Sequence, residues 1–131
     1  MSESKYDKYF ITNHVRSGPK RKGGAFGALR AAFPNVKFTG GFGFYSEPFI
    51  MIDKTHVHKY DDYLFFFGSN PDDISDFDAE WELCMGEEEE VHKINKTTLV
   101  YIPPGIIHCP LRLVKVNKPV FLMHIMDGIG E

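Results

Sequence analysis

The sequence has few cysteines, no long apolar run and little excess charge, and each absence excludes a class of protein. Two cysteines, Cys84 and Cys109, are too few for a disulfide scaffold. The first residues lack the apolar core of a secretory signal, so we expect both thiols to be reduced in the cytoplasm. No apolar run approaches the roughly 20 residues that span a bilayer. A net charge of -3 and a pI near 6.1 give no reason to expect nucleic acid or an anionic membrane as partner.

What the chain does have is length enough for one core and an excess of aromatic residues. Its 131 residues are 43% hydrophobic and include twelve Phe and six Tyr. A domain of this size is stable without a disulfide or a structural metal, so any metal is expected to serve function. Aromatic side chains favour strands over helices. The composition therefore predicts a single, mostly β domain.

The spacing of apolar residues predicts many short strands and one helix. Phe26, Leu29 and Phe33 recur at helical spacing before Pro34, which predicts a short helix over residues 26–33. A strand is expected at 9–12 and an exposed basic loop at 16–24. Further strands are predicted at 36–38, 42–45, 49–52, 56–67, 79–85, 89–94, 99–102, 107–116 and 120–126. This pattern indicates an all-β barrel or sandwich over 36–131, with residues 1–35 packing on it as a strand, loop and helix.

The segment around residues 56–68 contains the most informative side chains. His56, His58 and Asp62 have the same parity, so on a regular strand they would face the same way. Two imidazoles and a carboxylate on one face can bind a divalent metal ion. A fourth donor, His108, follows the rigid Pro103-Pro104-Gly105 turn, and an intervening hairpin would return it to the same place. A lone histidine is more often structural, but this spacing favours a metal site.

These residues resemble the two motifs of the cupins, a family of small β-barrels. His56-X-His58, Asp62 and Gly68 resemble G(X)5HXH(X)3-4E(X)6G, with Asp in place of Glu. Pro103-X-Gly105-X-X-His108 resembles the second motif, G(X)5PXG(X)2H(X)3N, which here has Thr97 for its first Gly and Arg112 for its Asn. The resemblance implies a double-stranded β-helix, or jelly roll, with one divalent transition metal held by His56, His58, Asp62 and His108. Iron, manganese, nickel, cobalt and zinc all suit these ligands.

Other polar side chains are candidates for the wall of the pocket. His124, on the last strand, is either an inward acid or base beside the metal or a half-buried structural residue, and Glu47 is a second candidate acid or base. Tyr45, Tyr60 and Arg112 are expected to contact substrate, although an outward Arg112 is equally compatible with the pattern. Cys109 directly follows His108 and is expected to be a buried thiol on the opposite face. The basic loop at 16–24 is expected to be solvated and could attract an anionic substrate.

The resemblance implies several functions and does not choose among them. Cupins include lyases, decarboxylases, isomerases, dioxygenases, sugar-binding regulators and storage proteins. We expect a metal-dependent enzyme that acts on a small oxygen-rich or carboxylate-bearing metabolite. The alternatives are a non-catalytic metal-containing module that binds or senses a small molecule, and a structural barrel with an adventitious metal. Apolar surface, including outward Phe65 and Phe67, predicts a homodimer.

Overall fold

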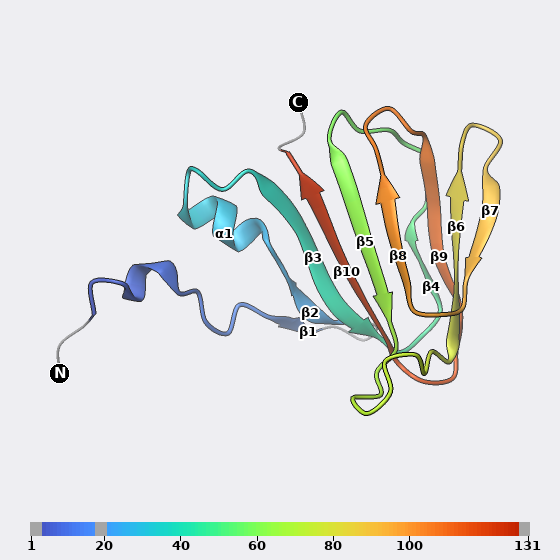
Figure 1. Ribbon diagram of the computed structural model, residues 1–131, viewed down its shortest axis with the longest axis horizontal. Coiled ribbons are helices and arrows are strands. Elements are labelled where there is room, and N and C mark those ends of the chain that lie inside the picture. The colour runs from blue at the N-terminus through green and yellow to red at the C-terminus, as the bar shows by residue number, and fades with distance from the viewer. Residues whose placement is uncertain (1–3, 18–20, 129–131) are drawn as a thin grey trace.

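The protein folds as two antiparallel sheets whose inner faces pack together. The computed structural model describes residues 4–17 and 21–128, and within them the strands form a six-stranded sheet, β1-β2-β3-β10-β5-β8, and a four-stranded sheet, β4-β9-β6-β7 (Figure 1). The strands are β1 Arg16–Ser17, β2 Arg21–Ala25, β3 Phe38–Tyr45, β4 Phe49–Ile52, β5 Asp61–Phe67, β6 Ala79–Met85, β7 Glu90–Ile94, β8 Thr98–Ile102, β9 His108–Val116 and β10 Val120–Asp127. The expected all-β jelly roll is confirmed.

Alternation along the strands decides which side chains enter the core. In β5, Asp62, Leu64 and Phe66 are buried while the residues between them are half-exposed. In β10, Val120 and Leu122 are buried on the same face. The two strands pair in register, with Leu64 opposite His124. A continuous inner face therefore carries apolar residues at one end and polar residues at the other.

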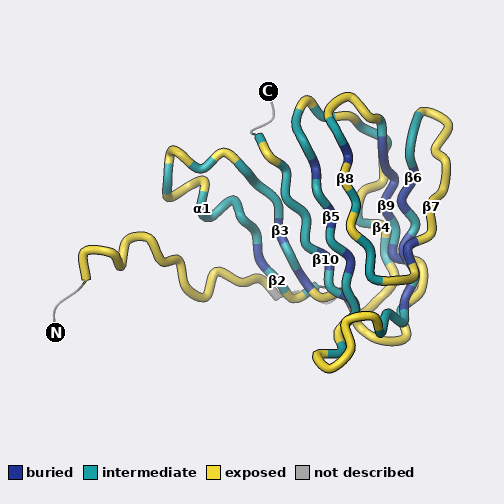
Figure 2. The backbone as a smooth tube through the Cα atoms, viewed as in Figure 1, coloured by how far each residue is buried: buried dark blue, intermediate teal, exposed yellow. Residues whose placement is uncertain are grey.

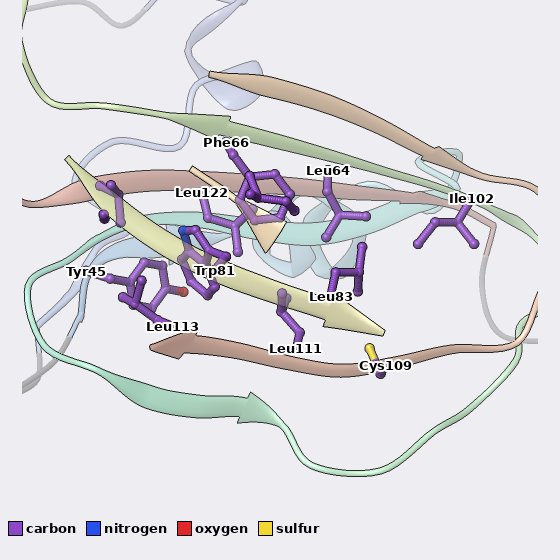
Figure 3. Close-up of a cluster of buried hydrophobic side chains, with 13 residues drawn as sticks. Tyr45, Leu64, Phe66, Trp81, Leu83, Ile102, Cys109, Leu111, Leu113 and Leu122 are labelled. Atoms are coloured by element: carbon purple, nitrogen blue, oxygen red, sulfur yellow. The ribbon is translucent and has the colours of Figure 1, made fainter. Parts of the chain in front are cut away.

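Aromatic rings fill the end of the core that lies away from the polar residues (Figure 3). Trp81 is fully buried and contacts Tyr45, Phe49 and Phe66, with ring centroids 5.6, 6.3 and 5.5 Å apart. These residues come from strands of both sheets. Burial of large aromatic side chains supplies much of the stability of a domain of this size.

The N-terminal part of the chain differs from the expectation. The predicted strand at 9–12 is absent, and a 3₁₀-helix, η1, occupies Asp7–Tyr9 instead. The predicted basic loop contains β2, which pairs with β3 along Arg21–Ala25, while residues 18–20 lie outside the described part. Gly23 permits this close pairing, since a Cβ there would collide with the carbonyl group of Phe42. The run of basic residues and glycines that indicated a loop therefore contains β1 and β2, the last two strands at one edge of the six-stranded sheet.

The predicted helix is present as α1, Gly27–Ala32. Phe26, at its N-terminal end, holds it against β3 through Phe38 and Phe42, with ring centroids 5.8 and 5.4 Å apart. The helix therefore packs on the outer side of the six-stranded sheet. Before it, the exposed residues 4–15 run away from the two sheets (Figures 1 and 2).

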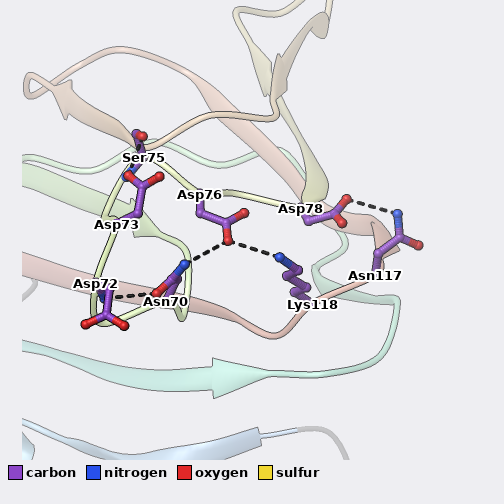
Figure 4. Close-up of polar contacts among 8 residues, drawn as sticks. All are labelled: Asn70, Asp72, Asp73, Ser75, Asp76, Asp78, Asn117 and Lys118. Atoms are coloured by element: carbon purple, nitrogen blue, oxygen red, sulfur yellow. Dashed lines mark hydrogen bonds and ion pairs between the residues drawn. The ribbon is translucent and has the colours of Figure 1, made fainter.

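A polar network ties together two loops at the apolar end of the barrel (Figure 4). Asp76 accepts hydrogen bonds from Asn70 and Lys118 at 3.1 and 3.0 Å, and Asn117 donates to Asp78 at 3.0 Å. The hydrogen bond from Lys118 lowers the pKa of Asp76. The loop between β5 and β6 is thereby fixed against the turn between β9 and β10. Among the described helices, none has the length and apolar character needed to cross a membrane.

Candidate metal centre

Three imidazoles meet at the end of the barrel opposite the aromatic core. The rings of His56, His58 and His108 have centroids 4.4 to 5.0 Å apart, and one ligand nitrogen from each lies within 4.8 Å of the other two. His108 is almost fully buried, whereas His56 and His58 are half-buried. The three side chains converge from segments about fifty residues apart in the sequence.

Backbone pairing rather than strand alternation holds the three histidines together. The predicted strand over 56–67 begins only at Asp61, so His56 and His58 lie in the segment that leads into β5. His56 and His108 form an isolated bridge in which each amide donates to the other's carbonyl group at 2.9 Å. The amide of Gly105 donates to the carbonyl group of His58, also at 2.9 Å. The Pro-Pro-Gly turn therefore returns His108 to the first motif, as the sequence predicts. The segments are held by these backbone hydrogen bonds and not by the alternation of one regular strand.

Asp62 is a buried carboxylate beside the three histidines. Its side chain projects from β5 and is buried, with one oxygen, Oδ2, 3.8 Å from Nε2 of His58 and 3.7 Å from Nε2 of His108. The other oxygen, Oδ1, is buried and has no hydrogen-bond partner among the described residues. A buried carboxylate oxygen without a donor is costly unless a cation or a donor satisfies it.

The hydrogen bond of His108 selects the tautomer of its neutral ring. Its Nδ1 lies 2.9 Å from the carbonyl oxygen of Ile106, and since a carbonyl only accepts, Nδ1 is the donor. In that tautomer Nε2 has the lone pair, and this nitrogen is buried and has no hydrogen-bond partner within the described part of the chain. Three imidazole nitrogens and one carboxylate, with two of these atoms otherwise unsatisfied, fit a divalent transition metal ion.

A small cavity of about 180 Å³ lies over the cluster. It is lined by His56, His58, Asp62, His108 and His124, and by apolar or sulfur-containing side chains that are Met51, Ile52, Leu64, Leu83, Ile102, Cys109, Leu111, Leu122 and Met126. Ligand pockets for drug-sized molecules are about 300 Å³ or larger, so this cavity suits a small molecule. Its charged or imidazole side chains are the three histidines, Asp62 and His124.

Burial shifts the pKa of several groups around this cavity. It lowers the pKa of His58, and the neighbouring His56 and His108 lower it further. Burial also lowers the pKa of His124; the charge of Asp62 opposes this shift, and the charge of Arg21 adds to it. Burial, with Asp62 nearby, raises the pKa of Cys109 to about 12. The neutral form of His58 and of His124 is therefore favoured, as metal binding by His58 requires, while the thiol of Cys109 is inert at neutral pH.

Tyr60 and His124 lie beside the cluster, but of the two only His124 lines the cavity. The ring of Tyr60 stacks on His58 with centroids 4.6 Å apart, and its hydroxyl group lies 3.7 Å from the sulfur of Met126. Burial and the charge of Asp62 raise the pKa of Tyr60. His124 lines the cavity directly. Tyr60 orients a histidine of the cluster, and His124 faces the interior.

Three other sequence-predicted site residues lie elsewhere, and their placement in the pocket wall is corrected. Tyr45 is 2% exposed within the aromatic core, stacked on Phe49 at 5.2 Å. Glu47 is exposed in the connection between β3 and β4. Arg112 forms an ion pair with Glu82 at 3.1 Å on the outer side of its sheet.

The position of Arg112 has an identifiable cause. The pairing of β9 with β6 changes register between Leu83 and Met85, and Cys109 adopts a positive φ of 78°. The alternation that begins at His108 is therefore interrupted, so that Leu111 and Leu113 point inward and Arg112 points outward. For the same reason Cys109 lines the same cavity as His108 rather than the opposite face, although it is buried as expected.

One charged side chain on the inner face was not predicted as a site residue. Arg21 was assigned to the solvated basic loop, but it lies in β2 and is partly buried. Arg21, Gly23 and Ala25 alternate along β2, and Gly23 and Ala25 lie opposite glycines of β3. This run of glycines was the signal in the sequence for an inward Arg21, because two glycine-rich strands leave room for a long side chain between them.

No family model and no curated protein matches the chain, but solved structures do. Oxalate decarboxylase of Bacillus subtilis, a protein with Mn(II) centers, is 14% identical over 90% of this chain and 28% of its own, with a TM-score of 0.54. An RmlC-like cupin from Shewanella frigidimarina is 9% identical over 92% of this chain and 90% of its own, at 0.53. A sugar phosphate isomerase of the cupin superfamily from Silicibacter pomeroyi is 9% identical over 88% of this chain and 69% of its own, with a TM-score of 0.55. The chain thus spans about a quarter of the decarboxylase, and at these identities the likeness concerns the fold.

Proposed function

We propose, from the cupin fold that this chain has, that the protein is a metal-dependent enzyme acting on a small oxygen-rich or carboxylate-bearing metabolite. The observation that carries the proposal is the convergence of the three imidazoles near the buried carboxylate of Asp62, with Nε2 of His108 and Oδ1 of Asp62 both lacking a partner among the described residues. A buried carboxylate and a buried ring nitrogen are costly in an apolar interior unless a cation or a donor satisfies them. His56, His58, His108 and Asp62 would hold that ion.

The rest of the cavity suits chemistry on a small anion. A bound divalent cation would act as a Lewis acid toward a carboxylate, carbonyl or hydroxyl oxygen of the substrate. The apolar lining excludes water and strengthens electrostatic interactions with the substrate. His124 is the one titratable cavity residue outside the cluster apart from the inert Cys109, and its lowered pKa suits a neutral imidazole that accepts a proton. Lyase or decarboxylase, isomerase and dioxygenase reactions are all compatible with a bound divalent cation, an apolar lining and one neutral imidazole.

The second candidate is a metal-containing module that binds or senses a small molecule without turnover. The scarcity of acid or base groups favours it, because the cavity wall beyond the cluster is almost entirely apolar. Both candidates predict metal and ligand binding, whereas only an enzyme converts the ligand. Product analysis with the bound ligand separates them.

The proposal includes a cytoplasmic location and a homodimer. Cys84 and Cys109 are free thiols, which a reducing compartment preserves. On the outer face of the six-stranded sheet, Phe65 and Phe67 are half-buried and Leu99 is 68% exposed. A second copy covering this face would bury it. Sedimentation equilibrium of the wild-type protein measures the oligomeric state, and a monomer at micromolar concentration contradicts this part.

Elemental analysis of protein purified without a metal-affinity tag tests the site. We expect about one equivalent of transition metal in the wild type and at most about a tenth of that in His58→Ala and His108→Ala, because each variant removes one of four ligands. His92→Ala is the matched control, since His92 is exposed on β7 and its Nε2 lies 2.6 Å from Oε1 of Glu90. It should retain the wild-type content.

A wild-type protein that neither contains metal nor takes up added Mn²⁺, Fe²⁺, Co²⁺, Ni²⁺ or Zn²⁺ contradicts the proposal. Equal loss of metal in His92→Ala would also contradict it, because the metal would then not depend on this cluster. Circular dichroism of each variant checks that the jelly roll persists. Metal identity then selects the assays, with oxygen consumption for iron and decarboxylation or isomerisation for the others.

A further inference from the structure

Arg21 lies on the inner face of the six-stranded sheet. It pairs with Tyr45, whose side chain points into the core, so the two residues share a face. The side chain of Arg21 crosses β3 over its glycines. A Cβ built on Gly43 would lie 3.0 Å from Cγ and 3.3 Å from Nε of Arg21, and one on Gly41 would lie 3.8 Å from Nη2. The two glycines therefore form a channel that the arginine occupies.

Among the residues that the structure describes, none supplies a counter-ion to the guanidinium group in this channel. Its Nη2 donates to the carbonyl oxygen of Gly24 at 2.9 Å. The guanidinium group also hydrogen-bonds to the side chain of Tyr45, whose pKa is raised by burial while Arg21 acts in the opposite direction. Nε is buried and has no partner in the residues that the structure describes, and no carboxylate of these residues forms an ion pair with Arg21. Since a partly buried cation without an anion is unfavourable, the group is set up to bind one.

The channel leads toward the candidate metal centre. Gly41 is the β-sheet partner of His124, and His124 lines the cavity together with the histidine cluster. The charge of Arg21 also acts on His124. Because Gly41 and Gly43 have no side chains, nothing on the inner face of β3 stands between the guanidinium group and His124. Arg21 is not among the residues that line this cavity, so a ligand that reaches it from the histidine cluster would have to extend past His124.

We propose that Arg21 binds a second carboxylate of the substrate, so that the site takes a small dicarboxylate with one anionic end at the histidine cluster and the other at Arg21. A guanidinium group presents paired N–H donors that match a carboxylate, and such charge-assisted bonds are strong where water is excluded. Binding of the first carboxylate at the histidine cluster rests on the proposed function, whereas binding of the second rests on Arg21 alone. The sequence assigned this residue to solvent, so the inference follows from its position in β2.

Binding of dicarboxylates to the Zn²⁺-loaded protein tests the proposal by calorimetry. The probes are oxalate, malonate, succinate and glutarate, each compared with the monocarboxylate of equal carbon number. We expect at least one dicarboxylate to bind the wild type about 10- to 100-fold more tightly than its monocarboxylate, the range given by one charge-assisted contact. Arg21→Met, which keeps the length of the side chain, should reduce the preference to about twofold or less. Arg21→Lys should keep part of it.

Lys22→Met is the matched control. Lys22 is the next residue of β2, is exposed, and faces the opposite side, so this variant removes the same charge from the same strand. It should leave the preference unchanged. A purely structural role for Arg21 predicts that Arg21→Met lowers thermal stability while the remaining folded protein keeps its dicarboxylate preference. That result, or no preference in the wild type with its metal in place, overturns the proposal.

Chemical modification separates this proposal from the metal centre. Phenylglyoxal reacts with accessible arginines, and mass spectrometry of peptides gives the rate at Arg21 in the metal-free protein. Millimolar succinate should slow that rate by about threefold or more, whereas the rate at the outward Arg112 should not change. If the wild type binds no metal but succinate still protects Arg21, the proposed function fails and the anion site stands. If metal binds and no dicarboxylate protects Arg21, the anion site fails and the metal centre stands.

Discussion

The two ends of the barrel interior are built by the same strands for opposite purposes. At one end Trp81, Phe66 and Tyr45 pack ring against ring. At the other end Asp62 and His108 are the buried polar or charged residues of the described chain, and each has an atom without a partner. Along β5 the inner face changes from Phe66 through Leu64 to Asp62 within four positions.

The difference shows how a small domain separates stability from binding. Aromatic packing lowers the free energy of the folded state, while the unsatisfied end raises it until a cation binds. Because β5, β9 and β10 each reach both ends, the packed end fixes the positions of the candidate ligands at the other. Substitutions at the two ends of the metal-free protein should therefore affect stability with opposite signs.

The largest effect is expected at the packed end. Trp81→Ala removes a fully buried side chain that contacts three other aromatic rings, and should lower the free energy of unfolding by about 3–5 kcal/mol. Urea unfolding of the metal-free protein measures it. Ile74→Ala is the control, since this side chain is 66% exposed in the loop between β5 and β6, and it should change the free energy by about 0.5 kcal/mol or less. Similar losses in the two variants would contradict the assignment of this end as the source of stability.

A smaller effect of opposite sign is expected at the polar end. Asp62→Asn replaces a buried, unpartnered carboxylate by a neutral group of the same shape, and should raise the stability of the metal-free protein by about 1 kcal/mol. The same variant should bind Zn²⁺ at least about tenfold more weakly, because the anionic ligand is lost. Urea unfolding and competition with a chelator measure the two quantities.

Asp61→Asn is the matched control for this prediction. Asp61 is the adjacent residue of β5, and its carboxylate accepts a hydrogen bond from Tyr101 at 2.7 Å, outside the cavity. Its substitution should leave Zn²⁺ affinity unchanged. A loss of metal-free stability in Asp62→Asn would show that the carboxylate is satisfied in the folded protein, and would remove the contrast between the two ends.

The sequence predicted the regular strands and the histidine cluster better than it predicted the pocket wall. Strands β4 and β6 begin and end where apolar spacing placed them, because both are regular and bounded by turn residues. His56, His58 and His108 depend on motif spacing and a rigid turn, which are local properties. The N-terminal strands were missed because Gly23 and its basic neighbours are typical of loops, and only pairing with β3 makes them a strand.

The side chains of Arg112 and Arg21 show why the wall could not be predicted. Arg112 was placed by strand alternation from His108, but the interruption at Cys109 turned it outward. Arg21 was placed in solvent, but strand pairing turned it inward. One irregular residue reverses the face of every position that follows, and the sequence does not mark where such a residue lies. The interruption at Cys109 and the pairing of β2 with β3 thus reversed the positions expected for the two arginines.

The smallest predicted effect is the pH dependence of stability at the polar end. Burial lowers the pKa of His124 and His58 in the folded protein below the value near 6.5 of the unfolded chain, so between these values the unfolded state binds more protons. The contribution of these groups to stability is therefore fully present above about pH 6.5, and it is lost as the pH falls through the folded pKa values. The melting temperature of the metal-free protein should fall by a few degrees from pH 7 to pH 5. His124→Gln should flatten this dependence and the exposed His92→Gln should not, whereas an unchanged slope in His124→Gln would show that the polar end is hydrated rather than buried.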